Sequence, residues 1–204
     1  ESHLSSTVTS RNLYPPRVED LESRINLLHA YGWEESEFPQ EWVHDFNTYL
    51  QGISVMSSQV RKILIDNGVK IPICVCGLGI DHLDDIESES NYFVNAKKFK
   101  FLHVSSCFPR KGIDVLLKAY GQAFSASDEV SLIIKTFKNP HNDVDQILKN
   151  EQSENSKYPH VIIINEDLSN SDLQKLYVSS DVLVAPSRGE GFGLPIAEAM
   201  LLDL

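Results

Sequence analysis

The chain has 204 residues, of which 42% are hydrophobic and 23% charged, which is enough apolar material for a sizeable core in one or two domains. Lys and Arg number 18 against 29 Asp and Glu, and a surface with a net charge of -11 argues against nucleic acid as a partner. No apolar run approaches the roughly 20 residues of a membrane span, and no signal-peptide pattern opens the chain. The three cysteines form no disulfide framework, so we expect a cytoplasmic protein.

The first eighty residues predict short and irregularly spaced elements. We expect the Ser- and Thr-rich first ten residues to be an end without regular structure or the edge of a further element. Apolar spacing predicts helices at 20–30, 41–50 and from the capping residues Ser57 and Ser58 to 66, and strands at 52–56 and 71–75. We interpret residues 1–80 as the end of one domain and 81–97, which includes an acidic Ser-rich stretch, as a linker.

A regular alternation of strands and helices begins near residue 98. Aliphatic runs predict strands at 99–104, 130–135, 161–164 and 182–185, each followed by a helix, at 112–123, 143–149, 171–177 and from Pro195 to Leu204. This alternation predicts an α/β, Rossmann-like domain over 98–204, a parallel sheet covered by helices on both faces. Because the chain opens with Glu1 and the last helix is expected to run to Leu204, we expect a piece of a longer protein with an incomplete fold.

Parallel sheets bind ligands beyond the carboxyl ends of their strands, so the loop after the fourth strand is a candidate site. It holds three glycines, Gly189, Gly191 and Gly193, and runs through Leu194 and Pro195 into a helix. Glycines let backbone N–H groups approach a ligand, and the N-terminus of a helix favours phosphate. The pattern therefore predicts a phosphate-binding turn.

Two carboxylates flank this turn, Glu190 and Glu198. Carboxylates accept hydrogen bonds from paired hydroxyls, which are what sugars present. A plainer interpretation of Glu198 is a favourable charge near a helix N-terminus, and a solvated turn residue remains an alternative for Glu190.

The loop after the first of these strands carries the adjacent basic residues Arg110 and Lys111. A planar guanidinium and a compact ammonium suit a diphosphate. The alternative is a solvated basic pair opening a helix. Cations are disfavoured at that position, so their presence there favours an anion site.

Three segments together resemble a known family: Phe-Pro-Arg-Lys-Gly-Ile-Asp at 108–114, Asp-Val-Leu-Val-Ala-Pro-Ser at 181–187 and Glu-Gly-Phe-Gly-Leu-Pro-Ile-Ala-Glu at 190–198. They look like a retaining GT-B glycosyltransferase of family four, the group 1 glycosyltransferases, whose hallmark is two glutamates separated by seven residues. The resemblance covers residues 98–204 and extends more weakly to Gly79-Ile80-Asp81 and to 54–68. It implies the donor-binding domain preceded by the tail of the acceptor domain.

The resemblance also implies a role for each site residue. Glu198 would bind ribose hydroxyls and Glu190 the hydroxyls of the donor sugar, while Lys111 would neutralise the departing diphosphate, which makes Glu190 and Lys111 the catalytic candidates. The backbone that approaches the phosphates and sugar would be that of Gly191, Phe192, Gly193 and Leu194. The family often has Gly-Arg five residues before its lysine, where this chain has Ser105-Ser106, and Arg110 is our candidate to substitute. The family needs no metal at the donor site, so no metal or separate cofactor is expected.

The function expected is transfer of a sugar from a nucleotide-sugar donor, with retention, to a hydroxyl of a saccharide, lipid-linked or other acceptor. The rivals are a non-catalytic nucleotide-sugar-binding or interaction module of the same fold, which Ser105-Ser106 favours, and a glycosidase using Glu190 and Glu198 as its carboxylate pair. Peripheral membrane contact through parts outside this chain stays open, as do the base, the sugar and the oligomeric state.

Two further signals receive structural interpretations. Asp143 and Asp145 open a predicted helix, where capping is favoured over metal binding. Cys74 and Cys76 alternate along a predicted strand, share a face and are assigned to the core.

Overall fold

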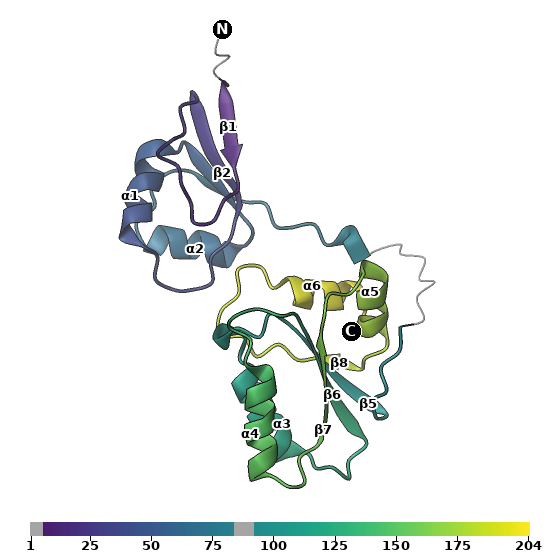
Figure 1. The fold of residues 1–204 in the computed structure, drawn as a ribbon. Helices are drawn as coiled ribbons and strands as arrows, with labels where there is room; N and C mark the ends of the chain where they lie inside the picture. The colour runs from purple at the N-terminus through teal and green to yellow at the C-terminus, as the bar shows by residue number, and fades with distance from the viewer. Residues whose placement is uncertain (1–5, 84–91) are drawn as a thin grey trace. The chain divides into compact units, whose positions relative to one another are not determined.

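A computed structural model describes residues 6–83 and 92–204 and divides the chain into two compact units (Figure 1). The first comprises the chain up to Gly79 together with Gly189–Phe192, and the second comprises Ile80–Arg188 and Gly193–Leu204. The acidic residues 84–91 of the predicted linker lie outside the described residues; residues 92–97 have no regular structure. No helix within the described ranges is both long and apolar enough to cross a membrane.

The first unit is a parallel sheet with strands in the order of the sequence. Its strands are β1 (Val8–Arg11), β2 (Ile25–Tyr31), β3 (Gly52–Val55) and β4 (Ile73–Val75). Two helices connect them, α1 (Gln40–Tyr49) from β2 to β3 and α2 (Ser58–Asp66) from β3 to β4. The Ser57 hydroxyl accepts a hydrogen bond from the Val60 N–H at 3.2 Å, which confirms the predicted cap of α2.

The helix predicted over 20–30 is wrong, because that segment contains strand β2. The strand was hard to recognise because a polar residue, Asn26, occupies an inward position, where its side-chain amide donates to the Leu21 carbonyl at 3.2 Å. A register shift between Leu28 and Tyr31 breaks the alternation again, with Ala30 at a φ of +48°. Of the two expectations for the first ten residues, that of an end without regular structure is wrong for Val8–Arg11, which form a polar edge strand paired with β2.

An aromatic-rich core holds the first unit together. Phe46 on α1 is fully buried among aliphatic side chains of β2, β3 and α2, such as Leu28, Val55 and Leu64. Trp33 packs edge-on against Phe38, with ring centroids 5.1 Å apart. This packing lets one small sheet bury an apolar face against both helices.

The second unit contains the α/β fold predicted over 98–204. Its strands are β5 (Phe99–Val104), β6 (Val130–Thr136), β7 (His160–Asn165) and β8 (Val182–Leu183), all parallel in the order β7-β6-β5-β8. The helices that follow them are α3 (Ile113–Ala123), α4 (Val144–Glu154), α5 (Asn170–Val178) and α6 (Leu194–Leu201), with the short 3-10 helices η1 (Asp81–Leu83) and η2 (Pro109–Lys111). The parallel sheet is confirmed, whereas α6 ends at Leu201 instead of continuing to Leu204.

Helices cover both faces of this sheet, as predicted. Alternate residues of β6 belong to different apolar clusters: Leu132 and Ile134 pack with α3 and α4, and Ile133 packs with α5 and α6. All three are fully buried. Strands β6 and β7 are therefore aliphatic on two faces, which is why their sequences form continuous apolar runs.

Two structural interpretations need correction. Cys74 and Cys76 share a face, with their Sγ atoms 3.8 Å apart, but both are exposed and neither belongs to the core, because β4 is a three-residue edge strand. Asp143 stands at the start of α4, yet its side chain makes no capping hydrogen bond. The Asn142 side-chain oxygen accepts from the Val144 N–H instead, at 3.3 Å.

Candidate functional site

The strand order of the second unit reverses beside β5. The chain moves outward from β5 to β6 and β7, then returns to place β8 on the other side of β5. Open parallel sheets bind ligands at such a reversal, in the crevice beyond the carboxyl ends of the two flanking strands. The loops that leave β5 and β8 there are the two that the sequence singled out.

The two loops meet through their backbones. The Arg188 N–H donates to the Arg110 carbonyl at 2.7 Å. Gly112 has a φ of +72°, and a Cβ on it would lie 2.2 Å from the Pro186 carbonyl oxygen. Glycine is therefore required at 112 both for its conformation and for the close approach of the other loop.

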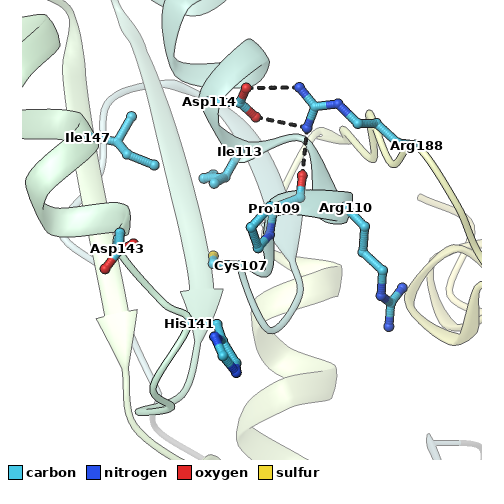
Figure 2. Close-up of a pocket in the computed structure, with 9 residues that line it drawn as sticks. All are labelled: Cys107, Pro109, Arg110, Ile113, Asp114, His141, Asp143, Ile147 and Arg188. Carbon is cyan, nitrogen blue, oxygen red and sulfur yellow. Dashed lines mark hydrogen bonds and ion pairs between the residues drawn. The ribbon is translucent and has the colours of Figure 1, made fainter.

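A bidentate ion pair adds a side-chain contact between the loops. Arg188 donates to both carboxylate oxygens of Asp114, at 3.0 and 2.8 Å, and to the Pro109 carbonyl at 2.6 Å (Figure 2). Hydrogen bonding from Arg188 lowers the pKa of Asp114 below its usual value and raises that of Arg188 itself. Asp114 lies in the first turn of α3, where its negative charge also interacts favourably with the helix dipole.

A buried polar chain lies beneath the first loop. His103 is 1% exposed, and its Nδ1 lies 2.8 Å from the Val184 carbonyl of the β8 segment, so Nδ1 carries the hydrogen. Its Nε2 lies 2.8 Å from the Ser105 hydroxyl, which in turn accepts from the Cys107 N–H at 3.0 Å. Cys107 has a φ of +54°, so the Ser105 hydroxyl supports a strained turn.

Arg110 and Lys111 occupy η2, and both therefore precede α3 instead of opening it. The Lys111 N–H donates to the Phe108 carbonyl at 2.7 Å, and Gly112 separates η2 from the helix. Figure 2 shows the Arg110 guanidinium directed away from the Asp114–Arg188 pair. The basic pair thus lies on the loop at the strand reversal, within the second unit.

Glu198 is buried, with 4% of its surface exposed, on the fifth residue of α6. The Tyr177 hydroxyl donates to its Oε2 at 2.7 Å and the His82 Nε2 donates to its Oε1 at 2.8 Å. Burial, and after it the negative charge of Glu198, raises the pKa of Tyr177, which keeps the hydroxyl protonated as a donor. Glu198 is therefore not an exposed charge on the helix surface. A carboxylate has about four acceptor positions, so two remain for other donors.

The glycine-rich loop is divided between the two units. Gly189–Phe192, which carries Glu190 and Gly191, belongs to the first unit, whereas Lys111 and Glu198 belong to the second. Gly193 precedes α6 with a φ of +82°, a left-handed conformation that glycine adopts without strain. Leu194 is the first residue of that helix.

A cavity of about 430 Å³ lies beside the first loop, within the second unit (Figure 2). Its apolar wall belongs to the α3–α4 side of the sheet and its rim is charged; the lining residues are Cys107, Pro109, Arg110, Ile113, Asp114, His141, Asp143, Ile147 and Arg188. Burial raises the pKa of the Cys107 thiol. Because Tyr177 packs on the α5–α6 side, Glu198 and this cavity lie on opposite faces of the sheet.

Several contacts of the site could not be found from sequence spacing. Asp114 and Arg188 are 74 residues apart, and His82 and Glu198 are 116 apart. Arg188 had one signal, its place inside the glycine-rich loop, whereas nothing in the sequence singled out Tyr177. Among residues 6–83 and 92–204, no group of three or more His, Cys, Asp or Glu side chains is placed to hold a metal.

The fold and site define a class: a doubly wound α/β protein with its candidate ligand loops at the strand reversal. Residues 84–204, more than half of the chain, match the family model "Glycosyl transferases group 1". The chain belongs to this family. Comparison with curated protein sequences gave no match.

Solved structures with the same fold include glycosyltransferases of the GT-B type. A sucrose-phosphate synthase from Thermosynechococcus elongatus is 18% identical, with a TM-score of 0.63 over 87% of this chain and 48% of that one. An alpha,alpha-trehalose 6-phosphate synthase from Burkholderia multivorans is 12% identical, with a TM-score of 0.66 over 87% of this chain and 54% of that one. A pneumococcal O-GlcNAc transferase in complex with UDP and GlcNAc is 18% identical, with a TM-score of 0.62 over 88% and 36%. The chain spans about half the length of the first two.

Proposed function

We propose that this chain is the donor-binding part of a retaining glycosyltransferase of family four. The parent protein would transfer a sugar from a nucleotide-sugar donor to a hydroxyl acceptor without a metal at the donor site. The observation that carries the proposal is the strand reversal, where the loop bearing Lys111 and the loop leading to Glu198 are hydrogen-bonded to one another. Family membership of residues 84–204 supports the same assignment.

The chemistry proposed for these residues is electrostatic. As the bond to the anomeric carbon breaks, negative charge grows on the diphosphate, and the Lys111 ammonium and the amides of Gly193 and Leu194 stabilise it. Glu198 accepts hydrogen bonds from the ribose hydroxyls through the lone pairs that Tyr177 and His82 leave available. Glu190 binds hydroxyls of the transferred sugar, which orients the anomeric carbon for attack.

Calorimetric titration with nucleoside diphosphates tests the basic pair. Lys111→Ala should weaken binding by about 1.5–3 kcal/mol, the range for a hydrogen bond to a charged group, and the binding should be salt-sensitive. Arg110→Ala should weaken diphosphate binding by less than Lys111→Ala does. Arg110 is a candidate to take the place of an arginine that the family carries at another position. Lys118→Ala, an exposed lysine on α3, is the matched control. Unchanged affinity in both site variants would place the phosphates elsewhere.

The roles proposed for Glu190 and Glu198 can be distinguished by which ligands each variant binds more weakly. Glu198→Gln should weaken nucleoside diphosphates and nucleotide sugars alike, because both contain the ribose. Glu190→Gln should leave diphosphate affinity nearly intact and lower turnover in the full-length parent. Equal affinities in the parent and Glu198→Gln would remove the ribose assignment, and undiminished Glu190→Gln turnover would remove the sugar assignment.

A non-catalytic module of the same fold is the second candidate, and Ser105-Ser106 is the feature that favours it. The Ser105 hydroxyl is engaged with His103 and the Cys107 N–H, and Ser106, at the position where the family often has arginine, brings no positive charge to a diphosphate. Product analysis of the full-length parent with a nucleotide sugar and an acceptor separates the two. Binding without product supports the module, while sugar release in the absence of any nucleotide would indicate a glycosidase.

A further inference from the structure

Strand β6 carries one charged side chain, Lys135, at its sixth position. Alternation along the strand puts Lys135 on the same face as Ile133, the α5–α6 side, and its register partners Val104 and Ile164 pack on that side too. Glu198 also lies there, through its bond to Tyr177. Lys135 therefore lies near the carboxyl end of the sheet, one strand from β5, where the strand order reverses. It lies on the same face as Glu198, the candidate ribose-binding residue.

The ammonium group of Lys135 is buried and poorly paired. Lys135 is 9% exposed, and its Nζ donates to the Thr136 carbonyl at 3.1 Å. An ammonium has three N–H donors, so two have no partner among the residues that the structure describes. Burial lowers the pKa of Lys135, and the negative charges of Asp167 and Glu166, which lie beyond ion-pair distance, only partly oppose this.

An ammonium in this situation destabilises the protein that carries it. Removing a charge from water costs several kcal/mol unless an opposite charge and hydrogen bonds compensate, and one carbonyl supplies only part of that. An oxyanion bound beside Nζ would provide both the missing charge and the missing acceptors. The position of Lys135 suits such a ligand, because doubly wound sheets receive phosphate-bearing ligands at this end.

We propose that Lys135 is a binding residue for an oxyanion of the donor, separate from the basic pair on η2. This inference rests on the proposed function. Two parts of a nucleotide sugar can present an oxyanion to a buried ammonium: the diphosphate, or an acidic group on the sugar itself. The low exposure of Lys135 makes its contribution less sensitive to salt than that of a lysine in solvent.

The proposal makes stability and binding change in opposite directions. In Lys135→Met the charge is gone and the apolar stem remains, so the Tm of the free 204-residue chain should stay equal or rise by about 2–4 °C, while affinity falls tenfold or more. Lys135→Gln keeps a polar end without the charge and serves if the methionine variant folds poorly. Lys138→Met, an exposed lysine three residues on, should change neither quantity.

Calorimetry would use inorganic pyrophosphate, the diphosphates of uridine, guanosine and adenosine, and the glucose and glucuronate esters of whichever diphosphate binds tightest. A loss shared by every probe assigns Lys135 to the diphosphate, and a loss confined to the glucuronate ester assigns it to the sugar. A Tm below the wild-type value in both Lys135 variants, or a loss under threefold for every probe, overturns the inference. A wild-type chain that binds no probe refutes the proposed function and this inference with it.

Discussion

Removing the Tyr177 hydroxyl should lower the unfolding free energy of the second unit by more than removing the hydroxyl of another buried tyrosine does. That hydroxyl donates at 2.7 Å to the Glu198 carboxylate, and both residues are buried, at 0% and 4% exposure. A hydrogen bond to a charged group contributes about 1.5–3 kcal/mol, against about 0.5–1.5 kcal/mol for one between neutral groups. Tyr177→Phe also leaves Oε2 without its donor where water has little access, so we expect a loss of about 2–3 kcal/mol.

A matched variant isolates the effect of the carboxylate. Tyr120 is buried in the same unit, and its hydroxyl donates at 3.0 Å to the neutral carbonyl of His160. Tyr120→Phe removes the same atom, so it should cost about 1 kcal/mol. Urea unfolding of the wild-type protein and both variants, followed by circular dichroism, gives the two differences in unfolding free energy. If Tyr177→Phe costs no more than Tyr120→Phe, the charged character of the Glu198 contact is refuted.

Two further predictions concern the junction of the loops. Gly112→Ala should cost more unfolding free energy than Gly193→Ala: both positions have positive φ, a strain of about 1–2 kcal/mol, but only at 112 does the new Cβ meet a backbone atom, the Pro186 oxygen at 2.2 Å. Equal losses in thermal unfolding would argue against the close approach. Because Arg188 lowers the pKa of Asp114, their pair stabilises the fold above the usual Asp value of about 3.9 and is lost as the pH falls below it. The stability advantage of the wild-type protein over Asp114→Asn should therefore shrink between about pH 5 and about pH 3, and a constant difference would contradict the pairing.

The second unit could be predicted from sequence because its strands are buried on two faces. Continuous aliphatic runs such as Leu132–Ile134 are typical of strands buried on two faces, and the helices predicted between the runs indicated a parallel sheet. Strand β2 of the first unit has no such continuous aliphatic run. An inward Asn26 and a register shift before Tyr31 removed its period-two pattern. The Asn26 side-chain amide is satisfied partly by the Tyr49 carbonyl, 23 residues along the chain, a contact that only folding forms.

For the site, the sequence by itself determined the two loops and their chemistry: glycines before a helix, a basic pair after a strand, and two carboxylates. Their surroundings were decided only by the tertiary structure. The fold buries Glu198 between Tyr177 and His82 and, among residues 6–83 and 92–204, gives the Lys135 ammonium a single hydrogen bond. Burial and pairing arise only in the folded chain, where residues more than a hundred positions apart become neighbours. A residue's charge can be read from its letter, but the partners that set the energy of that charge come from the packing of strands and helices.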